Sequence, residues 1–151
     1  MQASILNLLN ELQHENQSAY IFISHDLSVV SYLADEIAVV YLGHLMEVGA
    51  TPEVLAPPYH PYTEALLSAI PLVDPHARQQ QIRLEGDIPS PIDIPGGCRF
   101  HTRCPRFLGD ICANQEPPWQ EGVHGHRIYC HIPLSELSEM QQLVIEMQEA
   151  E

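Results

Sequence analysis

The sequence contains no lysine: its six basic residues are all arginines, against twenty Asp and Glu. The absence of lysine excludes, within these 151 residues, a Schiff-base lysine and the lysine of a phosphate-binding P-loop. The formal charge of -14 disfavours unassisted binding to nucleic acid or to an anionic membrane surface, because like charges repel. We therefore expect no nucleic-acid partner.

Long apolar runs are also missing. No stretch approaches the roughly 18 to 20 uninterrupted apolar residues that a membrane-spanning helix needs. The first residues, MQASILNLLNELQ, lack the basic segment that begins a signal peptide. These two absences predict no direct membrane insertion and a cytoplasmic location.

The first third of the chain has the patterning of an α/β protein. Apolar residues at helical spacing predict a helix over 3–14, and an unbroken apolar run predicts a buried parallel strand over 19–23. Asp26 is placed to cap a short helix after that strand. Residues 37–42 predict a second buried strand, which turns back at once into a strand over 45–48. Together these elements predict the end of an α/β sheet.

Two helices and a proline-rich segment follow. Thr51 is predicted to cap one helix, and a second helix is predicted to begin after Pro61 and to end at Pro71. Between Pro71 and Pro133 seven further prolines interrupt any regular period, so this segment is disordered or held by something other than a hydrophobic core. Apolar residues at helical spacing among glutamates predict a terminal acidic helix over 136–151.

All four cysteines lie in the proline-rich segment, with five, seven and seventeen residues between neighbours: Cys98, Cys104, Cys112 and Cys130. Disulfides are disfavoured because nothing in the sequence indicates secretion. Structural zinc sites usually take their cysteines in closely spaced pairs, which are missing here. Four thiolates around an iron–sulfur cluster tolerate irregular spacing, and the anionic cluster favours nearby arginines. The spacing alone leaves zinc, a cluster and unligated thiols open.

Histidine is frequent, with nine residues. Four of them lie near the cysteines and could replace one as a ligand, although exposed loop histidines are the commoner outcome: His101, His124, His126 and His131. His25 differs because it directly follows the predicted strand over 19–23, and the carboxyl edge of a parallel sheet is where α/β proteins bind ligands. Taken alone, this pattern more often marks an ordinary turn histidine.

Two groups of motifs resemble a known family. The first resembles the last part of the ATP-binding subunit of ABC transporters, from the histidine switch onward: ISHDL at 23–27, AVVYLG at 38–43 and EVG at 47–49. The second resembles the C-terminal extension of the oligopeptide/dipeptide importers: HPYT at 60–63, LLSAIP at 66–71, GDIPSP at 86–91 and GCRFHTRCP at 97–105. The resemblance covers nearly the whole chain, up to about Leu134.

The resemblance implies both a fold and a function. The fold class is α/β: the C-terminal fragment of a P-loop NTPase sheet, that of the ABC ATPases, followed by a loop-rich, cysteine-stapled extension and a terminal helix. The function is that of an ATP-binding subunit driving peptide import. It would be peripheral, on the cytoplasmic side of the cell membrane, with membrane-spanning permease subunits and a second ATP-binding subunit as partners. His25 would be the catalytic switch histidine, contacting the ATP γ-phosphate and the attacking water.

Cofactors and segment boundaries follow from the same resemblance. It implies ATP with Mg2+ in the complete subunit, and a [4Fe-4S] cluster on the four cysteines as metal ligands, with Zn2+ as the alternative. The implied segments are a remnant of the nucleotide-binding domain over 1–50, a helical connection with the His-Pro-Tyr motif over 51–72, the cysteine segment over 73–134 and an acidic helical tail over 135–151.

The sequence departs from the family in what it lacks. In the family, the switch histidine is preceded by several motifs that this sequence lacks. They are the phosphate-binding loop with its lysine, the signature motif, and the Walker B strand with its aspartate and adjacent glutamate. We therefore expect a C-terminal fragment that does not hydrolyse ATP alone. One alternative is a free-standing protein that binds a metal or iron–sulfur cluster and acts as partner or regulator of an ABC ATPase. Another is a nonfunctional product.

Overall fold

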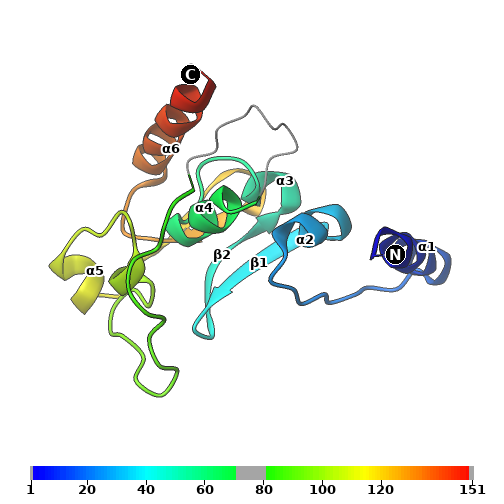
Figure 1. The fold of residues 1–151 in the computed structure, drawn as a ribbon, viewed down its shortest axis with the longest axis horizontal. Helices are drawn as coiled ribbons and strands as arrows, with labels where there is room; N and C mark the ends of the chain where they lie inside the picture. The colour runs from blue at the N-terminus through cyan, green and yellow to red at the C-terminus, as the bar shows by residue number, and fades with distance from the viewer. Residues whose placement is uncertain (1, 71–80, 150–151) are drawn as a thin grey trace. The chain divides into compact units, whose positions relative to one another are not determined.

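The computed structural model describes residues 2–70 and 81–149, and Figure 1 shows its ribbon. The chain divides into two compact units, Met1–Asp35 and Glu36–Glu151, which are treated separately below. The predicted end of a helix at Pro71 lies outside the described residues. Helices and a small antiparallel sheet together make a mixed α/β structure.

The first unit consists of two helices, as predicted: α1 (Gln2–Asn16) and α2 (Leu27–Leu33). Asp26 caps α2, because its carboxylate accepts hydrogen bonds from the backbone N–H groups of Ser28 and Val29. The hydroxyl of Ser28 also donates to Asp26, and this bond, followed by the two backbone bonds, lowers the pKa of Asp26. Tyr32 Oη donates to Asn7 Oδ1 over 2.8 Å and so links α2 to α1.

The prediction of a buried parallel strand over 19–23 is wrong. This segment has no regular secondary structure and pairs with no strand, and Ile21 and Ile23 are 96% and 91% exposed. A parallel strand takes all its hydrogen bonds from neighbouring strands. No other strand lies in the described part of the first unit, so the apolar run has nothing to pair with.

The second unit is built on four antiparallel strands: β1 (Glu36–Tyr41), β2 (His44–Ala50), β3 (Trp119–Glu121) and β4 (Arg127–Tyr129), in the order β1-β2-β4-β3. The predicted hairpin is confirmed. Leu42 and Gly43 connect β1 to β2, and both have positive φ, as a tight turn of this kind requires. The predicted strand over 37–42 forms as β1, but its alternating exposure shows that it is buried on one face only.

The second unit also contains four helices and two 3-10 turns among its described residues: α3 (Thr51–Val54), α4 (Pro61–Ser68), α5 (Asp110–Asn114), α6 (Leu134–Glu149), η1 (His101–Arg103) and η2 (Val123–Gly125). α4 begins at Pro61 as predicted, and α6 begins two residues earlier than predicted. The predicted cap at Thr51 is wrong: Ala50 occupies the N-cap position, and no side chain caps α3.

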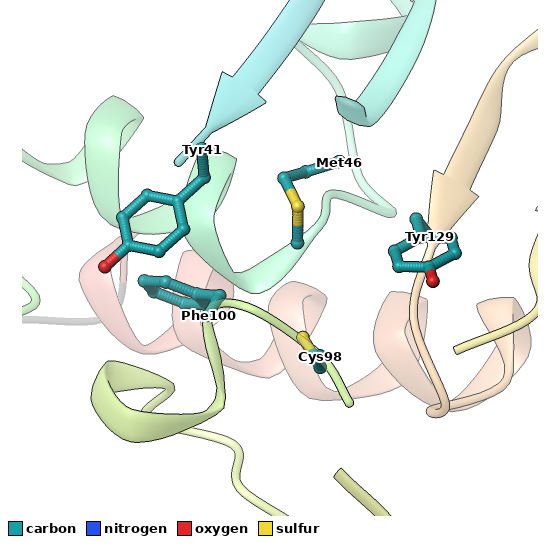
Figure 2. Close-up of a cluster of buried hydrophobic side chains, with 5 residues drawn as sticks. All are labelled: Tyr41, Met46, Cys98, Phe100 and Tyr129. Atoms are coloured by element: carbon teal, nitrogen blue, oxygen red, sulfur yellow. The ribbon is translucent and has the colours of Figure 1, made fainter. Parts of the chain in front are cut away.

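An aromatic cluster forms the main core of the second unit (Figure 2). It contains Tyr41, Met46, Cys98, Phe100 and Tyr129. The rings of Tyr41 and Phe100 meet edge to face, with centroids 5.2 Å apart. The cysteine segment therefore supplies part of a hydrophobic core, and the expectation that it lacks one is wrong. A second cluster joins Ile128, Cys130, Ile132 and Leu137, and so packs α6 against β4.

The carboxylate of Glu47 on β2 is fully buried and joins three separate parts of the second unit. Its Oε1 accepts from His126 Nε2 over 2.7 Å, and its Oε2 accepts from the backbone N–H of His60 over 3.0 Å. The hydroxyl of Thr63 also donates to Oε2. Burial raises the pKa of Glu47, against the lowering effect of these hydrogen bonds.

His60 is buried and uses both ring nitrogens. Its Nδ1 accepts from the backbone N–H of Tyr62 over 3.0 Å and so caps α4. The ring also hydrogen-bonds to the backbone of Tyr129 on β4. Because Nδ1 must stay unprotonated to accept, the ring is neutral in the fold, and burial lowers its pKa to about 3.

Gly97 allows the cysteine segment to pack closely on α5. Its φ is +59°, and a Cβ at this position would overlap the carbonyl oxygen of Cys112. The next residue, Cys98, donates its backbone N–H to that same oxygen over 2.9 Å. A side chain at residue 97 is therefore excluded both by the backbone angle and by space.

We predict that acid destabilises the second unit through His60. The unfolded chain binds a proton at the ordinary histidine pKa of 6.5, whereas folded His60 does so only near 3. Between these values the unfolded state holds more protons, so stability falls as pH falls, by roughly 1.4 kcal/mol per pH unit. Urea unfolding followed by the fluorescence of Trp119, the single tryptophan, measures this slope.

The matched variant is His60→Asn, whose side-chain oxygen can still accept the Tyr62 N–H. Its slope between pH 6 and 4 should be shallower than that of the wild type by about one proton. The raised pKa of Glu47 acts with the opposite sign, and it is present in both proteins. Identical slopes in the two proteins would contradict the role assigned to His60.

We predict that Gly97→Ala destabilises the second unit more than Gly86→Ala. Both glycines have positive φ, which costs a non-glycine residue roughly 1–2 kcal/mol. Nothing lies within 4 Å of a Cβ at residue 86, whereas one at residue 97 clashes with backbone atoms of α5. The difference in unfolding free energy between the two variants isolates the clash, and equal losses would count against it.

Candidate functional site

The four cysteines come from separate elements of the second unit, and all are free thiols. Cys98 precedes η1, Cys104 ends it, Cys112 lies within α5, and Cys130 follows β4. Cys98, Cys112 and Cys130 are buried, and Cys104 is partly buried. The four thiols lie up to 32 positions apart in the sequence.

The thiols lie close enough to affect one another electrostatically. The pKa of Cys104 is raised to about 12, first by burial and then by the other three thiols, Cys130, Cys98 and Cys112. The pKa of Cys130 is raised to about 11, again mainly by burial and then by Cys98 and Cys112. At neutral pH these two side chains are therefore uncharged thiols in the fold as it stands.

The predicted metal ligands are not in a metal-binding arrangement. Across residues 2–70 and 81–149, no group of three or more His, Cys, Asp or Glu side chains could hold a metal ion. The histidines near the cysteines have other partners: His101 contacts the carbonyl of Cys98, His124 pairs with Glu53, His126 with Glu47, and His131 contacts the carbonyl of Gln115. None of these four contacts uses a thiol.

His25 lies in the first unit, on an exposed bend directly before α2. The segment over 19–23 that precedes it forms no strand, so the sheet edge on which it was expected is not formed. Hydrogen bonds on either side of His25 hold the bend in place. Asp26 caps α2, and the backbone N–H of Asp26 donates to Ser24 Oγ over 3.0 Å. The role of His25 remains a prediction.

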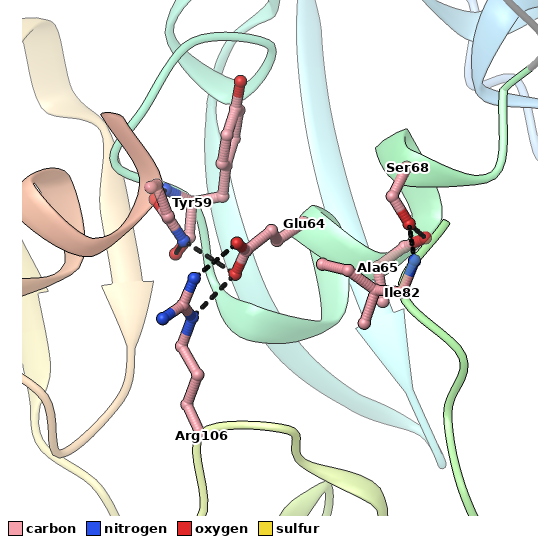
Figure 3. Close-up of polar contacts among 7 residues, drawn as sticks. Tyr59, Glu64, Ala65, Ser68, Ile82 and Arg106 are labelled. Atoms are coloured by element: carbon pink, nitrogen blue, oxygen red, sulfur yellow. Dashed lines mark hydrogen bonds and ion pairs between the residues drawn. The ribbon is translucent and has the colours of Figure 1, made fainter. Parts of the chain in front are cut away.

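Three arginines surround the first two cysteines. Arg99 Nη1 donates to the carbonyl of Leu42 in the hairpin turn over 2.5 Å. Arg106 forms a two-bond ion pair with Glu64 on α4, over 2.9 and 2.6 Å (Figure 3). Arg103 has a buried Nε with no hydrogen-bond partner among the described residues. The arginines thus connect the cysteine segment to the hairpin and to α4.

α4 is held at both of its ends (Figure 3). Ser68 at its last turn donates to the carbonyl of Ala65 over 2.7 Å and accepts the backbone N–H of Ile82 over 3.0 Å. Glu64 also accepts from Gln141 on α6 over 3.1 Å. Local sequence patterns do not single out Glu47, Glu64 or Gln141, because each finds its main partners at distant positions and no local period marks it.

Within the described residues, no helix is both long and apolar enough to cross a membrane.

Comparison with known proteins shows what the chain is similar to. Residues 46–112 match the family described as the oligopeptide/dipeptide transporter, C-terminal region. The chain is 46% identical over 132 residues to a protein of Sinorhizobium fredii named "Probable peptide ABC transporter ATP-binding protein y4tS". It is 44% identical over 134 residues to the oligopeptide transport ATP-binding protein AppF of Bacillus subtilis.

These matches cover 87% of this chain in both cases, but only 37% and 40% of the relatives. The chain thus spans about two fifths of the length of the curated relatives that it matches. Residues 46–112 thus match the C-terminal region of the oligopeptide/dipeptide transporter family, and most of the chain is similar to part of peptide ABC transporter ATP-binding proteins.

Proposed function

We propose that this chain is the C-terminal part of the ATP-binding subunit of an ABC importer for peptides. The observation that carries the proposal is the extent of the identity. An aligned stretch of 132 of the 151 residues, wherever it is placed, includes both His25 and all four cysteines. The similarity therefore spans residues of both units, and it reaches beyond the matched family region on both sides.

In the proposed subunit His25 is the switch histidine. Phosphoryl transfer depends on positioning and on donors aimed at the charge that develops on the γ-phosphate. His25 supplies one such donor from a bend that the capped start of α2 holds in place, and its exposure leaves the ring accessible to nucleotide. ATP with Mg2+ is the proposed cofactor, and the lysine that cradles its phosphates has to come from outside this sequence.

The exposed apolar segment before His25 supports the same proposal. Ile21 and Ile23 have no partners in the first unit, although the run has the pattern of a buried parallel strand. We infer that the rest of the subunit covers this exposed apolar segment. The proposed partners are the permease subunits and a second ATP-binding subunit, on the cytoplasmic side of the membrane.

We also propose that the four cysteines ligate a [4Fe-4S] cluster, with Zn2+ as the alternative. Supporting this, the thiols act on one another electrostatically, although no three are placed to hold a single ion. A cluster suits this arrangement of thiols better than a single ion, because a cluster holds its four thiolates further apart than one ion does. When bound, it would supply a covalent clamp on the loops or a one-electron redox centre. Arg106, close to Cys104 and Cys130, would balance its negative charge.

The ATPase proposal predicts complementation. The isolated chain should not hydrolyse ATP, whereas mixing it with the N-terminal three fifths of a relative such as AppF should restore hydrolysis. His25→Ala should lower the restored rate by roughly 100- to 1,000-fold, the usual cost of removing one donor to a developing oxyanion. His14→Ala removes a histidine from the same unit and should leave the rate unchanged. Hydrolysis by the chain alone would refute the proposal.

The cluster proposal predicts iron and labile sulfide in protein purified without oxygen, about four of each per chain, with the visible absorption of an iron–sulfur protein. Replacing any one cysteine by serine should lower both contents and the absorption together. Replacing His101 by alanine removes a neighbouring side chain that uses no thiol, and it should change neither. Stoichiometric zinc without sulfide would decide for the alternative metal.

A further inference from the structure

Two buried donors of the second unit have no hydrogen-bond partner among the residues that the structure describes. They are the hydroxyl of Tyr41, a residue that is 5% exposed, and the Nε–H of Arg103. Most buried polar groups in proteins are hydrogen-bonded, and a buried donor left without an acceptor lowers the folding equilibrium constant by roughly 5- to 30-fold. An acceptor from outside these residues would recover that loss.

The two donors lie in the same part of the aromatic cluster. The rings of Tyr41, Tyr62 and Phe100 contact one another, with centroids between 4.9 and 5.2 Å apart. Figure 2 shows the Tyr41 hydroxyl at the outer edge of the cluster, pointing out of it. Arg103 ends η1, and its backbone N–H donates to the carbonyl of Phe100 over 3.0 Å. Burial and then Tyr41 raise the pKa of Tyr62, whereas Arg103 lowers it, as expected if both lie near its hydroxyl.

The positive charge of Arg103 is not neutralised within the described part of the chain. There, Arg106 pairs with a carboxylate, that of Glu64, but Arg103 forms no ion pair. The neighbouring Arg99 donates to a backbone carbonyl, that of Leu42. A guanidinium with a buried N–H and no counter-charge attracts an anion. Because Arg103 is only partly buried, an anion can approach it from the surface.

We propose that Arg103 and Tyr41 bind an oxyanion, a carboxylate or a phosphate group, at the outer edge of the aromatic cluster. A guanidinium donates two parallel N–H groups to two oxygens of such a group, and the Tyr41 hydroxyl supplies a further donor. A neutral acceptor would leave the charge of Arg103 unpaired. Both donors are closed to solvent without the ligand, so binding includes a small opening of the two side chains. The proposal depends on neither the ATPase proposal nor the cysteine site.

Inorganic phosphate and acetate are the probes for this site. The full chain, labelled with nitrogen-15 and kept reduced, is titrated with each anion at an ionic strength held constant with chloride. The arginine Nε–H signals are followed by NMR, and the signal of Arg103 is assigned by its loss in Arg103→Gln. We expect this signal to shift and saturate with at least one probe. A response to phosphate alone identifies a phosphate group as the ligand, and a response to acetate alone identifies a carboxylate.

Three variants separate a built site from general attraction of anions. Arg103→Gln should abolish saturable binding. Tyr41→Phe keeps the ring and should weaken binding by about tenfold, a usual effect of losing one hydrogen bond to a charged group. Without the anion, Tyr41→Phe should fold more stably than the wild type, by roughly fivefold in the equilibrium constant, because the unpaired donor is gone. Arg83→Gln removes the same charge from an exposed position and should bind as the wild type does.

Several results would overturn the proposal. One is an Arg103 signal that responds to neither probe. Another is a Tyr41→Phe protein that is less stable than the wild type without the anion, because the hydroxyl would then already have a partner. A third is equal weakening of binding by Arg83→Gln and Arg103→Gln. Should Arg103→Gln fold poorly, Tyr41→Phe decides: an unchanged affinity refutes the site, and the predicted weakening supports it.

Discussion

The carboxylate of Glu47 lies fully buried where β2, the start of α4 and the residue before β4 meet. A buried carboxylate without donors is strongly unfavourable, and this one has three, from His126, His60 and Thr63. Two of these donors belong to the cap and the first turn of α4, so they tie that helix to the middle of β2. The position of α4 on the sheet therefore follows from the need to satisfy one charge.

α4 then passes this position on to the rest of the second unit. Each side chain along residues 60–64 makes a different contact: His60 caps the helix, Pro61 starts it, Tyr62 packs on Phe100, Thr63 reaches Glu47, and Glu64 holds Arg106. Thr63 fixes the helix to the sheet through Glu47, and Glu64 fixes the cysteine segment and α6 to the helix through Arg106 and Gln141. The His-Pro-Tyr motif is thus a junction between layers as well as a helix start.

Sequence patterns predicted what depends on near neighbours. The two helices of the first unit, the hairpin, the start of α4 and the terminal helix all follow from local spacing and caps. The strand expected over 19–23 failed because its partners would have to be other strands, and none lies in the described part of that unit. β3 and β4 have three residues each, too few to show a period, and they exist because β2 offers an edge to pair with. Spacing in the sequence identified the four cysteines. It did not identify the carboxylates of Glu47 and Glu64, because their partners lie at distant positions in the sequence.

The strand order β1-β2-β4-β3 has a consequence for synthesis of the chain. β2 pairs with β4 through Glu47 and Ile128, which are separated by most of the second unit. Contacts between such distant residues form slowly, because a long loop must close before they stabilise anything. While the chain emerges from the ribosome, the hairpin has a free edge until β4 has been made, and Glu47 lacks its partner until His126 has been made. The second unit can therefore complete its folding only after β4 has been made, and a chain broken off before Arg127 would expose that edge to aggregation.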